Sequence, residues 1–292
     1  MLNSRKQTAL AYVFLVPSLA LVAAFVLAPI TGTFITSLYR DSSYLANKYV
    51  GIANFVAILG DEGFYQALGV TVMFTIVAVC FEAVIGLLFA ILLHEQFAGR
   101  GALRALILIP WAIPTIISAK MWKLIFDYTY GILNVVLLDL GLIGDKVNWL
   151  GSSVAAFWCI IAAEVWKTTP FMVILLLAGL QAIPADLYQQ ARVDGAGVLK
   201  RFSSITLPLV KPVLLIALIF RTIDSLRIFD LIFVLTGGGP GGATKSLSML
   251  GYEYFTADRF GLGSAVSLLM FGLACIFTLV YLRFGRFREQ LA

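Results

Sequence analysis

Apolar runs long enough to cross a lipid bilayer recur along this chain and leave few alternatives for its fold. A membrane-spanning helix needs about 20 consecutive apolar residues, because the hydrocarbon core of a bilayer is about 30 Å thick. Hydrophobic residues make up 61% of the 292 residues, well above the roughly 45–50% of soluble domains. The sequence therefore predicts an all-α integral membrane protein, with about six transmembrane helices in a single domain over residues 1–292.

Polar or basic residues separate the apolar runs and set the approximate ends of the spans. We expect the spans at about 9–31, 67–93, 104–123, 153–180, 205–233 and 263–282. Pro110 and Pro114 predict a kink in the third span. The segments at 40–62 and 236–244 are expected to be loops, and the apolar piece at 132–142 is expected at the membrane interface rather than across it.

The basic residues outside the spans are unevenly distributed between the two sides that six spans define. If both termini are cytoplasmic, ten lie on that side: Arg5, Lys6, Arg100, Arg104, Arg192, Lys200, Arg201, Arg283, Arg286 and Arg288. Five lie on the other: Arg40, Lys48, Lys146, Lys245 and Arg259. Because basic residues favour the cytoplasmic side, we expect both termini in the cytoplasm. The net charge of +5 is then a topological signal and indicates no nucleic-acid partner.

No motif for nucleotide, metal or covalent catalysis is complete in this sequence. Lys245 follows Thr244 where a P-loop requires glycine, and His94 is the only histidine. The cysteines lie in apolar runs without C-x-x-C spacing, namely Cys80, Cys159 and Cys275. The sequence therefore predicts no catalytic residue, no metal site and no cofactor in this chain, so that any ATP driving it is hydrolysed by another chain.

A polar, glycine-broken stretch from Leu187 to Leu209 interrupts the apolar pattern between the fourth and fifth spans. Short helical patterns, each with apolar residues at i and i+4, flank Gly195 on both sides. The charge count puts this stretch in the cytoplasm. We therefore predict that this pair of short helices between two spans is bound by another protein.

Charged residues inside the spans are costly in hydrocarbon, so they mark either a polar path or structural ion pairs. The i,i+3 spacing favours pairing of Glu164 with Lys167, and of residues 221, 224, 227 and 230 in succession. Glu82 has no partner close in sequence and is expected to pair across helices or to lie near a cavity. Structural pairs and a substrate path remain equal alternatives here. For the substrate path we name these residues: Glu164, Asp224 and Arg227, with Trp166 and Phe229 as aromatic neighbours.

The stretch around Gly195 resembles the cytoplasmic signature E-A-A-x-x-x-G-(nine residues)-I-x-L-P of permease subunits in ATP-binding-cassette (ABC) importers. The matching positions keep every spacing: Gln189, Gln190, Ala191, Gly195, Ile205, Leu207 and Pro208. Gln189 and Gln190 depart from the Glu and Ala of the signature. An amide at the first position can still form hydrogen bonds but brings no charge.

The resemblance covers nearly the whole chain and points to the first permease of the pair in carbohydrate importers of the maltose and trehalose type. Segments that carry it include FLVPSLALVAAFVLAPI at 14–30, ALILIPWAIPTII at 105–117, EVWKTTPFM at 164–172, LAGLQAIPADLY at 177–188 and FDLIFVLTGGGP at 229–240. The resemblance implies the type I importer fold in a bacterial or archaeal cytoplasmic membrane. It implies as partners a second permease, an ABC ATPase dimer that binds ATP and Mg, and an extracytoplasmic sugar-binding protein.

The same resemblance implies that residues 184–208 form the coupling helix element, which the ATPase moves as a lever. The coupling residues would be Gln189, Gln190, Ala191, Asp194, Gly195 and Ala196. The cargo would be a sugar, most closely a disaccharide such as trehalose or maltose. Two other classes are alternatives: a membrane-embedded transferase acting on lipid-linked sugars through Glu82, Glu164 and Asp224, and a secondary transporter, which would need inverted repeats.

Overall fold

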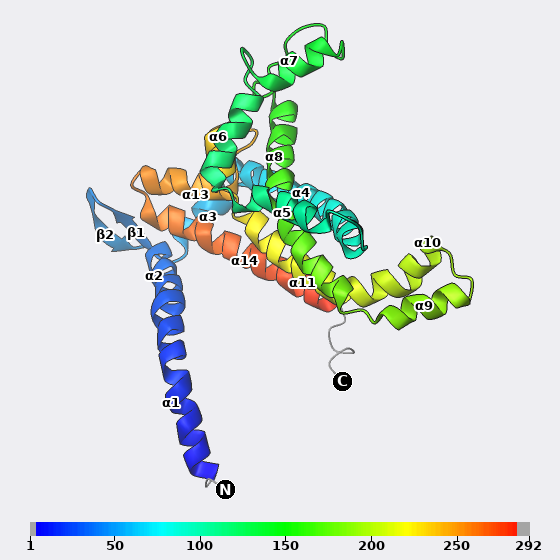
Figure 1. The fold of residues 1–292 in the computed structure, drawn as a ribbon. Coiled ribbons are helices and arrows are strands. Elements are labelled where there is room, and N and C mark those ends of the chain that lie inside the picture. The colour runs from blue at the N-terminus through cyan, green and yellow to red at the C-terminus, as the bar shows by residue number, and fades with distance from the viewer. Residues whose placement is uncertain (1–3, 285–292) are drawn as a thin grey trace. The chain divides into compact units, whose positions relative to one another are not determined.

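Helices make up most of the structure, a computed structural model that describes residues 4–284 (Figure 1). Five helical segments are long and apolar enough to cross a membrane: Tyr12–Ser37, Glu62–His94, Ser153–Gln181, Val198–Leu226 and Phe260–Arg283. Two shorter helices make a sixth span if they are counted together. The predicted all-α architecture with about six spans is therefore confirmed. Arg286 and Arg288, which are expected on the cytoplasmic side, lie outside the described residues.

The chain divides into two compact units, which are described separately. One unit contains the residues up to Phe64 together with Leu250–Phe271. It begins with α1 (Ser4–Val22), a π-helical turn η1 (Ala23–Leu27) and α2 (Ala28–Ser37). The π turn lies directly before Pro29, which has no N–H and would clash with the carbonyl four residues earlier in a regular α-helix.

The segment predicted as a polar loop at 40–62 has regular structure in this unit. Strands β1 (Tyr39–Ser42) and β2 (Leu45–Tyr49) form an antiparallel hairpin in which Tyr39 pairs with Tyr49. Helix α3 (Ala53–Leu59) follows, and Asn54 in its first turn donates to the carbonyls of Ser37 and Tyr39 at 2.8 and 2.9 Å. Asp258 accepts hydrogen bonds from the Ser42 hydroxyl and the Ser43 N–H at 2.7 and 2.8 Å.

The other unit contains Tyr65–Met249 and the residues from Gly272 on. Its long helices are α4 (Glu62–His94), which starts in the first unit, and α8 (Ser153–Gln181) and α11 (Leu207–Leu226). The shorter helices are α5 (Arg100–Ala112), α6 (Thr115–Ile125), α7 (Ile132–Asp139), α9 (Ala185–Val193), α10 (Val198–Arg201) and α12 (Asp230–Leu235). Helices α13 (Leu247–Thr256) and α14 (Phe260–Phe284) contribute residues to both units. Within this unit α8 packs against α5 and α11, and α6 packs against α12.

The third span is broken rather than kinked. Helices α5 and α6 meet at 95°, with Ile113 extended at φ −74°, ψ 130° and Pro114 preceding the first residue of α6. A residue before proline is driven out of the helical region because the proline ring crowds its backbone. The two prolines correctly predict a disruption of the helix, but the bend is larger than the predicted kink.

The fifth span starts earlier and ends earlier than predicted. Helix α10, the π turn η2 (Phe202–Thr206) and α11 form one continuous helical segment from Val198 to Leu226. The π turn again precedes a proline, here Pro208, and Leu207 donates to the carbonyl of Phe202 five residues back. The helix ends at Leu226, and a separate helix, α12, starts at Asp230. The predicted end at Phe233 is therefore wrong.

Candidate functional site

The polar stretch between α8 and α11 folds into a helical hairpin formed by α9 and α10 (Figure 1). Gly195 ends α9 with φ +75°, a conformation that costs an L-residue about 1 kcal/mol or more. The N–H of Ala196 donates to the carbonyl of Ala191 at 2.8 Å, and the N–H of Gly195 donates to that of Arg192 at 3.1 Å. These two bonds define a Schellman cap, which explains why glycine stands at this position.

The hairpin is anchored at its base and exposed at its tip. Tyr188 and Thr206 share a hydrogen bond of 3.0 Å between their hydroxyls, and Tyr188 packs with Ile205 against a cluster that includes Leu180 and Val210. At the tip, Val193 is 89% exposed and Leu199 is 83% exposed. Apolar side chains at such exposure are suited to contact with another protein.

The six residues expected to couple to the ATPase lie on and beyond α9. Gln190, Asp194 and Gly195 are exposed, and Ala191 and Ala196 are half-buried. Gln189 is exposed and also lines a cavity beside the hairpin. The structure thus places all six on an accessible element, and their contact with an ATPase stays a prediction.

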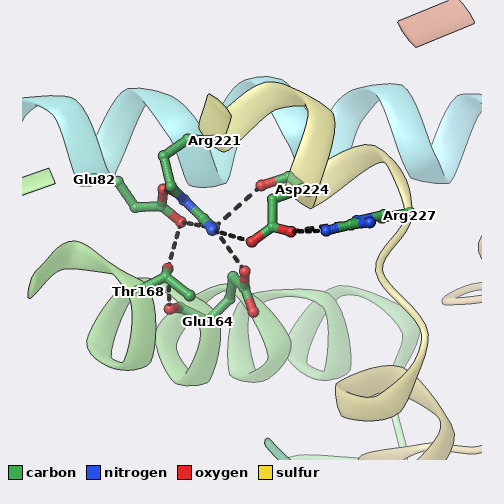
Figure 2. A network of polar contacts seen from close by, with 7 residues as sticks. Glu82, Glu164, Thr168, Arg221, Asp224 and Arg227 are labelled. Carbon is green, nitrogen blue, oxygen red and sulfur yellow. Dashed lines mark hydrogen bonds and ion pairs between the residues drawn. The ribbon is translucent and has the colours of Figure 1, made fainter. Parts of the chain in front are cut away.

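A second candidate site lies among the spans, where Arg221 on α11 bridges three carboxylates (Figure 2). Its Nε lies 2.6 Å from Glu82 Oε2, its Nη2 lies 2.8 Å from Glu164 Oε1, and its Nη1 lies 2.8 Å from Asp224 Oδ2. Thr168 Oγ1 donates to Glu82 Oε1 at 2.7 Å. One guanidinium therefore joins α4, α8 and α11.

The network runs from a buried end to an exposed end. The side chain of Glu82 is 0% exposed and that of Arg221 4%, whereas that of Asp224 is 50% exposed. The second oxygen of Asp224 pairs with Arg227 Nη2 at 2.8 Å, and the Arg227 side chain is 67% exposed. Five charged residues are thus linked, with three carboxylates and two guanidiniums. A buried charge needs such partners because its transfer out of water costs several kcal/mol.

Gly86 explains how α4 and α8 approach closely enough to share the network. A Cβ at this position would lie 2.7 Å from the Cβ of Met172 on α8, closer than two such atoms can pack. Small residues at crossings let helix backbones approach in membrane proteins. Gly86 lies one turn after Glu82, so the close crossing and the ion pair are adjacent on α4.

The structure confirms some of the ion pairs that spacing predicted and contradicts others. Arg221 pairs with Asp224, and Asp224 pairs with Arg227, as expected. Glu164 does not pair with Lys167 but with Arg221 on another helix. No ion pair joins Arg227 to Asp230 among the described residues, because the helix ends at Leu226 and the i,i+3 geometry is lost there.

Of the residues named for a substrate path, the network brings together Glu164, Asp224 and Arg227 but neither aromatic residue. Trp166 lies two residues, or about 200°, around α8 from Glu164. It contacts Trp122 at 5.6 Å between ring centroids and lines an apolar groove of about 690 Å³. Phe229 stacks on Phe233 at 5.3 Å.

The expectation that Glu82 pairs across helices is confirmed by its ion pair with Arg221, but neither residue was named for the site. The only signal for Glu82 in the sequence is that it is a lone charge in a long apolar span, since its partner is 139 residues away. Arg221 was noted only through its local spacing to Asp224. Contacts between distant helices cannot be read from helical periodicity.

The geometry defines a class of protein: a multi-pass membrane protein with charged residues linked between its spans and a helical hairpin exposed at one end. Residues 82–289 match a family described as "Binding-protein-dependent transport system inner membrane component". The chain belongs to this family, and so it is a permease subunit, with ATP hydrolysis carried out by a separate ATPase.

Relatives match over nearly the full length of the chain. A trehalose/maltose transport system permease of Thermococcus litoralis is 52% identical over 286 residues, covering 98% of this chain and 96% of the relative. A sulfoquinovosyl glycerol permease of Agrobacterium fabrum is 39% identical, covering 96% of this chain and 91% of the relative. A trehalose permease of Mycobacterium tuberculosis is 38% identical, covering 94% and 88%.

A solved structure confirms the fold. One chain of a bacterial ABC transporter for import of the acidic polysaccharide alginate superposes with a TM-score of 0.83. The two chains are 23% identical, and the match covers 96% of each. The type I importer permease fold inferred from the sequence is therefore confirmed.

Proposed function

We propose that this chain is the transmembrane subunit of an ATP-driven importer that carries a disaccharide such as trehalose or maltose. The observation that carries the proposal is the 52% identity over 98% of this chain to a permease named for trehalose and maltose transport. A second relative, at 38% identity, is named for trehalose transport. The hypothesis of a transferase for lipid-linked sugars has no support from family membership or relatives.

The proposal includes four kinds of partner. A second permease completes the membrane pathway, and an ABC ATPase dimer binds ATP and Mg below the α9–α10 hairpin. An extracytoplasmic binding protein delivers the sugar, and lipid surrounds the spans. The matched family is itself described as binding-protein-dependent, and the exposed tip of the hairpin supports a protein partner on that side.

We propose further that both termini are cytoplasmic and that residues 184–208 act as the coupling element within one permease domain. An even number of spans puts both termini on one side, and counting the bent pair as one span gives six. The excess of basic residues then favours the cytoplasm for the termini and for the α9–α10 hairpin. The sugar path would pass the exposed end of the network at Asp224 and Arg227, with Glu164 behind it; Trp166 and Phe229 stay candidates without support from the network.

The test is ATP-dependent uptake by the assembled transporter in proteoliposomes. Trehalose and maltose should each accumulate only when binding protein and ATP are present, and each should compete with the other. A matched ATPase variant that cannot hydrolyse ATP serves as the control. If neither disaccharide is taken up, the proposed cargo is wrong. Uptake without the ATPase would support a secondary transporter instead.

A further inference from the structure

A cavity of about 1020 Å³ opens beside the α9–α10 hairpin. Its walls come from the end of α4 and the residues after it, from the connection between α8 and α9, and from α9, α10 and η2. None of the residues of the charged network lines it. The volume lies just above the roughly 300–1,000 Å³ typical of ligand sites, so the cavity has room for more than a single ion.

The lining of this cavity carries an excess of positive charge. Arg100, Arg192 and Arg201 line it, against one carboxylate, Glu95. Arg100 is partly occupied, since its Nη1 donates to the carbonyls of His94 and Glu95 at 3.5 and 3.3 Å. The side chain of Arg192 is exposed and forms no ion pair or hydrogen bond within the described part of the chain.

Two nitrogen atoms of the lining residues are buried without a hydrogen-bond partner among the described residues. They are Nε of Arg201 and Nδ1 of His94. Buried polar atoms in native structures are almost always paired with protein, water or an ion. The Arg201 guanidinium has no protein counter-charge or acceptor among the described residues, as is also the case for the side chain of Arg192.

The rest of the lining is partly polar and partly apolar. Three glutamines line it, and its apolar part includes Ile91 near the end of α4, Leu180 near the end of α8, and Ile183 and Phe202. These apolar residues lie near the ends of three candidate membrane spans. A basic rim beside an apolar patch at the ends of spans matches an amphiphile with an anionic head.

We propose that this cavity binds the phosphate of an anionic phospholipid from the cytoplasmic leaflet, held by Arg192 and Arg201. Guanidinium groups bind phosphate through paired N–H donors. Basic pockets between transmembrane helices on the cytoplasmic side bind anionic headgroups in the same way. The assignment to this leaflet rests on the orientation given under Proposed function.

The cavity and the exposed tip use different faces of α9, so a lipid and a protein partner can be bound together. Ala185, Tyr188, Gln189 and Arg192 line the cavity at helical spacing of three and four residues. Gln190 and the 89% exposed Val193 do not line it. Gln189, one of the six expected coupling residues, lies in the cavity wall, so the cavity is free for the lipid when the ATPase contacts the hairpin through Gln190 and Val193.

The test uses the assembled transporter in nanodiscs of phosphatidylcholine, with or without phosphatidylglycerol. Arg192→Gln/Arg201→Gln is compared with Lys200→Gln, which removes a charge from the neighbouring position outside the cavity. Native mass spectrometry of retained phosphatidylglycerol and the midpoint of thermal unfolding are the readouts. Wild type and Lys200→Gln should retain the lipid and unfold at higher temperature with it, and the double variant should bind it about tenfold or more weakly.

Other arms of the experiment separate the alternatives. Equal lipid retention by the double variant and Lys200→Gln would overturn the proposal. Protection of wild type by inorganic phosphate in pure phosphatidylcholine, equal to that by phosphatidylglycerol, would reject the lipid as the source of the phosphate. Lipid retention seen only when the ATPase is left out would show that the ATPase fills the cavity. Sugar uptake in pure phosphatidylcholine vesicles is measured in parallel, because the proposed function fails only if uptake is absent in every lipid.

Discussion

At the scale of single residues, Arg221 is the residue on which most of the buried charge depends. Glu82 and Glu164 lie on different helices, and each has its ion pair with the same guanidinium. Within the described residues, no other ion pair involves either carboxylate. The loss of this one side chain therefore leaves two buried carboxylates without a counter-charge.

Arg221→Met is expected to destabilise the protein by about 3–5 kcal/mol, because it breaks buried ion pairs by removing one partner. Arg227→Met is the matched control and should cost about 0–1 kcal/mol, since the pair between Arg227 and Asp224 is solvent-exposed. The measurement is the unfolding of the purified transporter in detergent. Equal shifts for the two variants would show that Arg221 is not the centre of the network.

Asp258 gives a pH dependence to the hairpin of β1 and β2. Hydrogen bonds from Ser43, and then from Ser42, lower the pKa of Asp258 below its ordinary value. A carboxylate with a lowered pKa stabilises the folded state above its unfolded pKa, and this contribution is lost as the pH falls through the folded value. The hairpin should therefore be held at neutral pH and loosen only in acid.

The measurement is the mobility of a nitroxide label at Tyr44→Cys, at the hairpin turn, in a background without the native cysteines. Mobility should rise as the pH falls below the ordinary range of an aspartate pKa. In Asp258→Asn the label should already be mobile at neutral pH, with little further change in acid. A pH response that survives in Asp258→Asn would assign the effect to another group.

At the scale of elements, the α9–α10 hairpin depends on the backbone conformation of one residue. A Cβ at Gly195 would meet no atom within 4 Å, so only the positive φ opposes substitution. Gly197 offers a close comparison, because it also has open space around it but adopts φ −67°, which any residue can take.

Gly195→Ala is expected to destabilise the hairpin by about 1 kcal/mol and to lower sugar uptake per ATP hydrolysed. Gly197→Ala should change neither quantity appreciably. Hydrogen exchange of the amides in residues 185–201 reports the local stability, and uptake and ATPase rates report the coupling. If the two variants show the same hydrogen exchange and the same uptake per ATP hydrolysed, the Schellman cap has no role in coupling.

Elements with a strong local signal were predictable from the sequence, and those set by distant contacts were not. The spans in α4, α8 and α14 follow from long, predominantly apolar runs that need no partner to be recognised. The β1–β2 hairpin was missed because its pairing of Tyr39 with Tyr49 and its bonds to Asp258 lie in a segment that reads only as polar. The end of α11 at Leu226 was missed because the apolar residues of α12 continue the pattern across the break.

The candidate sites show the same division. The cap at Gly195 was predictable because the six residues that form it are neighbours in sequence. The network was only half predictable, since its i,i+3 pairs are local but its link from Arg221 to Glu82 spans 139 positions. Helical spacing also predicted an ion pair between Glu164 and Lys167, but Glu164 pairs with Arg221 instead.

At the scale of the whole molecule, the orientation in the membrane is the property that most other proposals depend on. The α9–α10 hairpin and the glycine-rich segment at 236–244 are separated in sequence by the span that contains α11. If that span crosses the bilayer, the two segments must face opposite sides. Basic residues outside the spans favour the cytoplasm for the hairpin.

Single cysteines at Lys200 and Lys245, in a background without the native cysteines, should test this orientation. A membrane-impermeant thiol reagent added to intact cells should label Lys245→Cys and should leave Lys200→Cys unlabelled until the membrane is opened. The reverse pattern would invert the proposed topology and would remove the α9–α10 hairpin from reach of an ATPase.

The continuous helical segment from Val198 to Leu226 has a mechanical consequence. Arg221 lies 23 positions beyond Val198 in that segment, or about 35 Å at 1.5 Å per residue. A tilt of about 5° at the hairpin end would displace Arg221 sideways by about 3 Å over this length. That displacement is as large as the 2.6–2.8 Å distances from Arg221 to Glu82 and Glu164. A small change of angle at the hairpin end is thus enough to separate Arg221 from Glu82 and Glu164.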